Sequence, residues 1–170
     1  MPKEGDPLSA AEVALLERWI KEGAQDDTPP DAYSTRLKEL PVYTSPAVVT
    51  SLTTSPDGKW LAISGYHEVF LLEAATLTLR GRLLGESPRI ESLAFSPDSQ
   101  HLAVSAGAPG RFGEIQVWNV AGTNQVNAWK LGTDSLFGVS WSPDGSRLAF
   151  GGTDKSVRII SATDGREQMK

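Results

Sequence analysis

The alternation of apolar and polar positions repeats three times after residue 47. In each repeat, a short apolar stretch leads into a Ser-Pro-Asp turn, and a second alternating stretch follows the turn. The turns are Ser55–Gly58, Ser96–Ser99 and Ser142–Gly145, and they begin 41 and 46 residues apart. Each repeat continues into a further apolar stretch, at residues 69–72, 115–118 and 157–160. The alternation predicts antiparallel strands, and strands repeated at this period are typical of β-propeller blades.

The residues of the turns explain how each hairpin closes. Proline presets φ for the second position of a type I turn, aspartate suits the third, and glycine adopts the left-handed conformation at the fourth. Ser99 stands where the first and third turns have Gly58 and Gly145. We expect a small energetic cost at Ser99, because a side chain disfavours left-handed backbone.

Residues 1–24 carry a different pattern, with apolar positions at helical spacing. Ser9 and Glu12 have the spacing of a capping box, and Leu8 and Val13 match a hydrophobic staple. Gly23 is the expected C-terminal stop. The apolar stripe consists of Val13, Leu16, Trp19 and Ile20. The pattern predicts one amphipathic helix, which requires a partner surface because so short a helix is not a domain by itself.

The organisation that follows is an all-β, partial β-propeller preceded by one amphipathic α-helix. We expect about three four-stranded antiparallel blades, at residues 47–85, 89–132 and 135–170. The last blade is expected to be incomplete, because residues 161–170 are too few for a turn and a full fourth strand. Residues 25–46 are rich in Pro and Asp and predict a linker.

Propellers close with about four to eight blades, so three blades leave two interpretations. Either the chain is a fragment of a longer propeller, or copies assemble to close a ring. An open arc would expose a sheet face and an unpaired strand edge.

Composition narrows the range of functions. The 170 residues carry a net charge of −5, which disfavours nucleic acid and anionic membrane as partners. No cysteine and only two histidines are present, so disulfides, thiolate zinc sites and three-histidine metal sites are excluded within these residues. No apolar run approaches the roughly 20 residues of a membrane span. The serines and glycines match no catalytic or nucleotide-binding motif, so the sequence favours a non-enzymatic protein.

Residues 47–170 resemble the blades of WD-repeat propellers. The likeness is strongest at Gly151–Ile160, where Asp154 stands at the position of the family's structural aspartate. The family's Trp-Asp pair appears here as Leu72-Glu73, Trp118-Asn119 and Ile160-Ser161, and no Gly-His pair precedes any first strand. The resemblance therefore implies the propeller fold, but with an incomplete version of the family's buried hydrogen-bond network.

A second resemblance covers residues 1–24. Met1-Pro2, Leu8-Ser9, Glu12–Leu16, Trp19-Ile20 and Gly23-Ala24 resemble the C-terminal end of a bacterial c-type cytochrome domain. Bacterial envelope proteins fuse such a domain to WD-repeat propellers, and Pro41–Leu72 is similar to their first blade. The resemblance implies that Met1 is an axial ligand of haem c, held by a Cys-x-x-Cys-His motif upstream of residue 1. It also implies a periplasmic or cell-envelope location, whereas a chain that truly starts at Met1 would be cytoplasmic.

Candidate binding residues lie in the loops that share one rim of the propeller. Loops on a rigid scaffold are where binding residues concentrate, and aromatic and arginine side chains dominate many interfaces. The candidates are Tyr66, His67, Glu68, Arg89, Arg111, Phe112, Asp134, Asp154 and Lys155. The alternative to a binding site is that these residues lie in surface loops that bind no ligand. His67 beside Glu68 offers too few ligands for a metal, and the turn aspartates are explained by turn formation.

Two functions from different classes follow. The first is a non-enzymatic interaction scaffold that binds a protein partner through its rim loops and needs no cofactor in this chain. The alternative is an electron-transfer haem protein in which the propeller is the docking part. An envelope propeller similar to the family associated with protein import and peptidoglycan-linked lipoproteins fits the Ser-Pro-Asp-Gly-x-x-Leu-Ala pattern equally well. The haem interpretation requires an upstream Cys-x-x-Cys-His and an export signal, and the scaffold requires neither.

Overall fold

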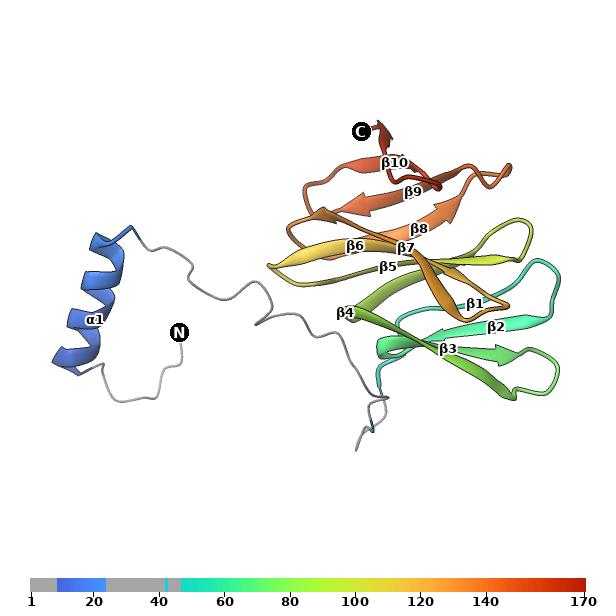
Figure 1. The fold of residues 1–170 in the computed structure, drawn as a ribbon, viewed down its shortest axis with the longest axis horizontal. Coiled ribbons are helices and arrows are strands. Elements are labelled where there is room, and N and C mark those ends of the chain that lie inside the picture. Colours follow the sequence, from blue (N-terminus) through green and yellow to red (C-terminus); the bar gives the residue numbers. More distant parts are fainter. Residues whose placement is uncertain (1–8, 24–41, 43–46) are drawn as a thin grey trace. The chain divides into compact units, whose positions relative to one another are not determined.

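The computed structural model describes residues 9–23, 42 and 47–170, which hold one helix and eleven strands (Figure 1). The chain divides into two units, Met1–Ser34 and Thr35–Lys170. The strands all lie in the second unit: β1 (Leu52–Thr54), β2 (Trp60–Ser64), β3 (Tyr66–Glu73), β4 (Leu79–Phe95), β5 (His101–Ala108), β6 (Phe112–Asn119), β7 (Asn124–Gly132), β8 (Leu136–Trp141), β9 (Arg147–Gly152), β10 (Val157–Ser161) and β11 (Glu167–Met169). Within each of the two sheets, β1 to β7 and β8 to β11, consecutive strands pair antiparallel, as the repeat pattern predicts.

In the first unit, α1 (Ala10–Lys21) has the predicted capping box. The Ser9 hydroxyl accepts from the Glu12 amide at 3.3 Å, and the Glu12 carboxylate accepts from the Ser9 amide at 2.8 Å. Gly23 follows with φ of +94°, which is the expected left-handed stop. The stripe of Val13, Leu16, Trp19 and Ile20 is exposed. Leu8 of the predicted staple, Met1 and most of the predicted linker lie outside the described residues.

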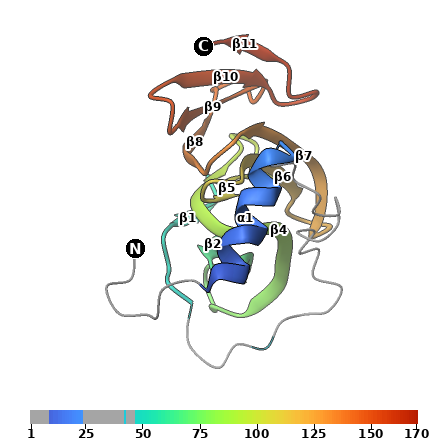
Figure 2. The same cartoon turned by 90° about the vertical axis from the view of Figure 1, so that its left-hand side faces the viewer.

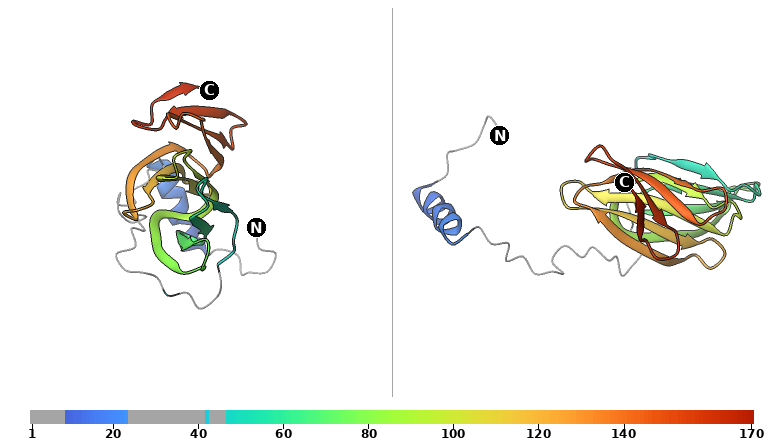
Figure 3. Two further views of the ribbon diagram at one scale, coloured as in Figure 1. Left: turned by 90° about the vertical axis from the view of Figure 1, so that its right-hand side faces the viewer. Right: turned by 90° about the horizontal axis from the view of Figure 1, so that it is seen from above.

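The strands form three blades that follow one another along the chain. The third blade is a separate four-stranded sheet, β8 to β11, at one end of the repeat region (Figures 2 and 3). The first two blades are joined through β4, whose first part pairs with β3 and whose last part pairs with β5. The connection between the blades expected at residues 47–85 and 89–132 is therefore extended backbone within β4 rather than a loop. In the third blade, β11 has only three residues, so the last strand is short as predicted.

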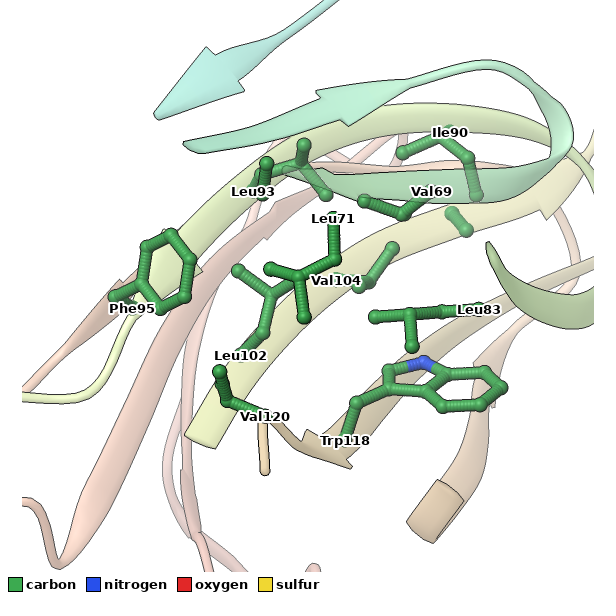
Figure 4. Packing of buried hydrophobic residues seen from close by; sticks show 12 residues of the cluster. Val69, Leu71, Leu83, Ile90, Leu93, Phe95, Leu102, Val104, Trp118 and Val120 are labelled. Atoms are coloured by element: carbon green, nitrogen blue, oxygen red, sulfur yellow. The ribbon is translucent and has the colours of Figure 1, made fainter. Parts of the chain in front are cut away.

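The core consists of two layers of side chains, one at each joint between blades. The first layer includes Leu71, Leu93, Val104 and Trp118, which come from both neighbouring blades (Figure 4). The second layer consists of Ala103, Ile115, Val117, Leu136, Val139, Leu148, Phe150 and Ile160. In β5, Leu102 and Val104 pack in the first layer and Ala103 in the second, because successive side chains of a strand point to opposite faces. Each blade is thus stabilised by its neighbours, as in other stacked repeats.

Hydroxyl groups supplement this apolar packing. The Ser51 hydroxyl accepts from the Leu93 amide of the next blade at 3.1 Å, and the Ser92 hydroxyl accepts from the Val139 amide at 3.3 Å. Gly138 occupies the equivalent position of the third blade, which therefore has no hydroxyl there.

The three Ser-Pro-Asp turns share one hydrogen-bonding pattern. Each serine hydroxyl donates to the aspartate Oδ1, at 2.6, 2.5 and 2.5 Å in chain order. Each also accepts from the first amide of the following strand at 2.9 Å. Gly58, Ser99 and Gly145 have φ of +71°, +61° and +72°, so the predicted left-handed position is confirmed in all three turns.

Candidate interaction surface

The ends of β3, β5, β6 and β7, together with the middle of β4, form a row on the rim opposite the Ser-Pro-Asp turns. Tyr66 pairs with Arg89, Arg89 with Gly107, Gly107 with Gly113, and Gly113 with Gly132. A Cβ on Gly113 would lie 2.1 Å from the Asp134 carbonyl oxygen, and one on Gly107 would lie 2.7 Å from the Ser135 Cα. The connection to the third blade therefore crosses directly over the ends of β5 and β6. The structure thus brings Asp134 close to the row that holds Tyr66 and Arg89.

Tyr66 and His67 are adjacent but differ in exposure. The Tyr66 side chain is half exposed, whereas His67 is 6% exposed and lies edge-on to the Tyr66 ring at 4.5 Å. The His67 Nδ1 lies 3.2 Å from the Glu86 carbonyl oxygen. Burial lowers the pKa of His67, because a charged imidazole is poorly solvated there. His67 therefore links the hairpin between β2 and β3 to Glu86 of β4, and the accessible ring is that of Tyr66.

Glu68 does not lie on the surface, contrary to the expectation that it belongs to an exposed loop. Its side chain is fully buried and makes two hydrogen bonds with the Arg82 guanidinium, from Arg82 Nε and Nη2. The hairpin after β2 is so tight that β3 already begins at Tyr66. Glu68 lies on the face of β3 that carries Phe70, opposite the core residue Val69, and Arg82 covers it there. Arg82 lies 5.7 Å from the centre of the Phe70 ring, which further fixes the guanidinium. Glu68 is therefore a structural residue.

A second polar cluster on the rim was not predicted. The Lys130 Nζ lies 2.9 Å from the Glu86 Oε1 and 4.5 Å from the centre of the Phe112 ring. Phe112 was one of the predicted binding residues, whereas Lys130 and Glu86 were not. Nothing in the local sequence indicates this contact, because Glu86 and Lys130 are 44 residues apart.

The remaining candidates are spread over two blades. Arg89 pairs with Glu91 at 2.7 Å, and Arg111 is exposed at the turn between β5 and β6. In the third blade, the Asp154 carboxylate accepts from Ser156 and from Arg158, so the pKa of this carboxyl is well below its usual range. Lys155 is exposed beside it with φ of +62°. The predicted residues therefore form one group around Tyr66, Arg89 and Phe112 and a separate pair on the third blade.

A buried network of hydrogen bonds lies beneath the group formed by Tyr66, Arg89 and Phe112. The Trp118 indole donates to the Gln116 carbonyl at 2.9 Å, and the Gln116 amide donates to Glu114 at 2.5 Å. The Ser87 hydroxyl also donates to the same Glu114 oxygen. This network ties β6 to the segment of β4 between Glu86 and Arg89 and keeps the rim in place. An alternation of Glu, Gln and Trp on one strand face could have suggested it, but not its partner Ser87.

Within the described residues, no group of three or more histidine or acidic side chains is arranged to hold a metal ion. The helix that is described is neither long nor apolar enough to cross a membrane.

The chain belongs to the WD40 family (WD domain, G-beta repeat), whose pattern matches residues 34–68, 76–111 and 125–161, more than half of the sequence. The second and third matches each begin near the outer strand of one blade and extend into the next blade. A sequence repeat is therefore offset from a structural blade, which ties successive blades together.

Two curated relatives share this pattern. Protein groucho of Drosophila melanogaster is 31% identical over 122 residues, which cover 70% of this chain and 16% of that protein. The uncharacterized WD repeat-containing protein sll1491 of Synechocystis sp. is 28% identical over 120 residues, which cover 69% of this chain and 33% of that protein. The chain thus spans a third or less of the length of either relative.

Solved structures show the same fold at lower identity. Hydrazine synthase of Kuenenia stuttgartiensis matches with a TM-score of 0.63 at 24% identity, over 77% of this chain and 37% of that chain. The WD40 repeats of RRP9 match with a TM-score of 0.65 at 15% identity, over 76% of this chain and 39% of that chain. These comparisons and the three blades confirm the predicted partial WD-repeat propeller.

Proposed function

We propose that this chain is a non-enzymatic interaction module that binds a partner protein through the rim group of Tyr66, Arg89 and Phe112. The observation that carries the proposal is the placement of an exposed aromatic ring and an exposed guanidinium directly opposite each other, Tyr66 at the start of β3 and Arg89 in β4. Tyrosine and arginine are enriched among the residues that contribute most to binding energy at protein interfaces. Membership of the WD40 family supports the same proposal.

Site-specific photo-crosslinking tests this proposal in the native host. A photoreactive phenylalanine replaces Tyr66 in one variant and exposed Val126 of β7 in the control. We expect discrete crosslinked products from position 66 that disappear when Arg89→Glu is added, and none from position 126. Equal products from both positions, or none from position 66, would contradict the proposal.

We propose also that further blades cover both ends of this three-blade stack. Leu52 is 66% exposed, although the equivalent Leu93 and Val139 are 6% and 8% exposed at their joints. Val157 is 67% exposed, whereas the equivalent Ile115 is fully buried. Blades encoded in the flanking sequence, or blades of a second copy, would bury these side chains. Further in-frame Ser-Pro-Asp repeats would support the first source, and a concentration-dependent mass of the separate chain would support the second.

The electron-transfer alternative rests on α1. Its exposed stripe of Val13, Leu16, Trp19 and Ile20 suits a helix that packs on a domain outside these residues. In this proposal the upstream domain holds haem c, with Met1 as a ligand, and the protein is exported to the periplasm or envelope. An in-frame Cys-x-x-Cys-His after an export signal, with a haem absorbance band in the purified protein, is the expected result. A stop codon directly upstream of Met1 would refute it and would favour a cytoplasmic protein.

A further inference from the structure

A cleft opens between the second and third blades, at the end of the sheets that carries the Ser-Pro-Asp turns. Its volume is about 490 Å³, within the usual range for sites that take a small ligand or a side chain. Pro97 and Asp98 line it from the turn of the second blade, Pro143 and Asp144 from the turn of the third blade, and His101 and Trp141 from the neighbouring strands. The cleft is remote from the Tyr66 rim, because β2, β5 and β9 each run from one end of the blade to the other.

The equivalent joint between the first and second blades is closed. There, the Ser99 side chain is 8% exposed, and its hydroxyl accepts from the Asp57 amide of the first blade at 3.1 Å. Phe95, which corresponds to Trp141, is also 8% exposed. At the open joint, Gly145 takes the place of Ser99, and a Cβ added to it would meet only Pro97 Cδ, at 3.9 Å. The missing side chain at residue 145 therefore leaves the space between the two turns unfilled.

The first turn also differs from the other two in the charges around its aspartate. The Asp57 carboxylate pairs with Lys59 at 3.2 Å. Gln100 and Ser146 replace that lysine in the other two turns. In the part of the chain that the structure describes, neither Asp98 nor Asp144 makes a direct ion pair, although the charge of Arg147 acts on Asp144, and no lysine or arginine lines the cleft. Hydrogen bonds from Ser96 and Ser142 lower the pKa of Asp98, and that of Asp144 to about 2, so both carboxylates are ionised at neutral pH.

A hydrogen bond fixes the position of the Trp141 ring in the cleft. The Trp141 indole Nε1 donates to the Ala94 carbonyl of the second blade at 2.9 Å. The His101 ring lies 6.4 Å from the Trp141 ring, tilted by 38°. An aromatic face flanked by two carboxylates attracts a cation that is both flat and able to donate several hydrogen bonds.

We propose that this cleft binds an arginine side chain of a partner protein, with the guanidinium against Trp141 and between Asp98 and Asp144. Arginine fits better than lysine, because its planar group stacks on an indole and donates in two directions at once. A calcium ion fits poorly, because it needs six to eight oxygen ligands, and Oδ1 of each aspartate already accepts two hydrogen bonds within its own turn. The site is independent of the Tyr66 rim and does not rest on the function proposed above.

Titration of the protein with an acetylated Gly-Arg-Gly amide tests the assignment. The five tryptophans carry a ¹⁵N label, and Trp141→Phe identifies the Trp141 indole signal. We expect a saturable shift of this signal with a dissociation constant on the order of 1 mM, weakened by salt. The same peptide with neutral citrulline in place of arginine should cause no shift, and a lysine peptide a smaller one.

Three variants complete the test. Asp98→Asn keeps an acceptor oxygen for its turn but removes the charge, and we expect it to weaken binding by about tenfold. Asp57→Asn makes the same change in the first turn and should leave binding unchanged. Gly145→Ser places in the third turn the residue type that the second turn has at Ser99, so it should narrow the cleft between the two turns and weaken the binding. Equal binding of the citrulline or lysine peptide, equal loss in Asp57→Asn and Asp98→Asn, or no saturable shift would overturn the proposal.

Discussion

At the scale of single residues, Ser99 shows how the chain compensates for an unfavourable backbone conformation. A left-handed φ of +61° disfavours serine by about 1 kcal/mol. The hydroxyl offsets this cost, since it accepts from the Asp57 amide in the neighbouring blade. The sequence alone indicated the energetic cost of serine at this left-handed position, but not the hydrogen bond that offsets it.

Two substitutions at residue 99 separate these effects. Ser99→Ala keeps the strain and removes the hydrogen bond, so we expect a loss of about 1–2 kcal/mol in the free energy of unfolding. Ser99→Gly removes both and should change stability by less than about 0.5 kcal/mol. Urea unfolding measures both. A larger loss for glycine than for alanine would contradict this account.

The turn aspartates predict a dependence of stability on pH. Hydrogen bonds from the serine hydroxyls lower the pKa of Asp57, Asp98 and Asp144 below their ordinary value of 3.8. The unfolded chain therefore binds protons more readily, so stability is full above about pH 4 and falls as the pH drops toward 2. The urea midpoint should decline over this range, and less steeply in Asp144→Asn. An identical decline in that variant would show that this carboxylate does not contribute.

At the scale of secondary structure, the buried Glu68–Arg82 pair fixes β3 against β4. Removal of the guanidinium alone leaves a buried carboxylate without a counter-charge. We therefore expect Arg82→Met to lower stability by about 3 kcal/mol, and Glu68→Gln added to it to restore part of the loss. The exposed pair Arg166–Asp164 is the control, and Arg166→Met should cost less than about 1 kcal/mol. Thermal unfolding distinguishes the two, and equal costs would refute a structural role for Glu68.

The boundaries of the strands also depend on pairing between neighbouring strands. The repeats predicted the three inner strands of each blade, but not the position of the outer strands, and a loop was expected where β4 continues through Glu86–Arg89. Pairing partners on both sides, β3 before this segment and β5 after it, keep the backbone extended. A local sequence that contains Ser-Pro indicates a turn, and neighbouring strands override that preference.

At the scale of the whole molecule, equivalent side chains differ in what covers them. Leu93 lies between two blades and is 6% exposed, whereas Leu52 holds the same position at the open end and is 66% exposed. In this chain, Leu93→Ala should lower stability by about 3 kcal/mol and Leu52→Ala by less than about 1 kcal/mol. If further blades cover the first blade, the two losses should converge in the longer protein. Chemical denaturation of both lengths measures this, and unchanged costs in the longer protein would mean that Leu52 stays uncovered.

The sequence by itself determined the three-blade repeat, the Ser-Pro-Asp turns and the capped helix. The turns and the helix cap depend on hydrogen bonds between residues two to five positions apart, and the repeat is visible as a pattern of residue types. Only the tertiary structure decided that Glu68 is buried against Arg82, that Lys130 joins Glu86 and Phe112, and that Gly145 leaves a cleft beside Trp141. Each of these depends on strand register or on the packing of one blade against the next, which brings together residues 14 to 47 positions apart.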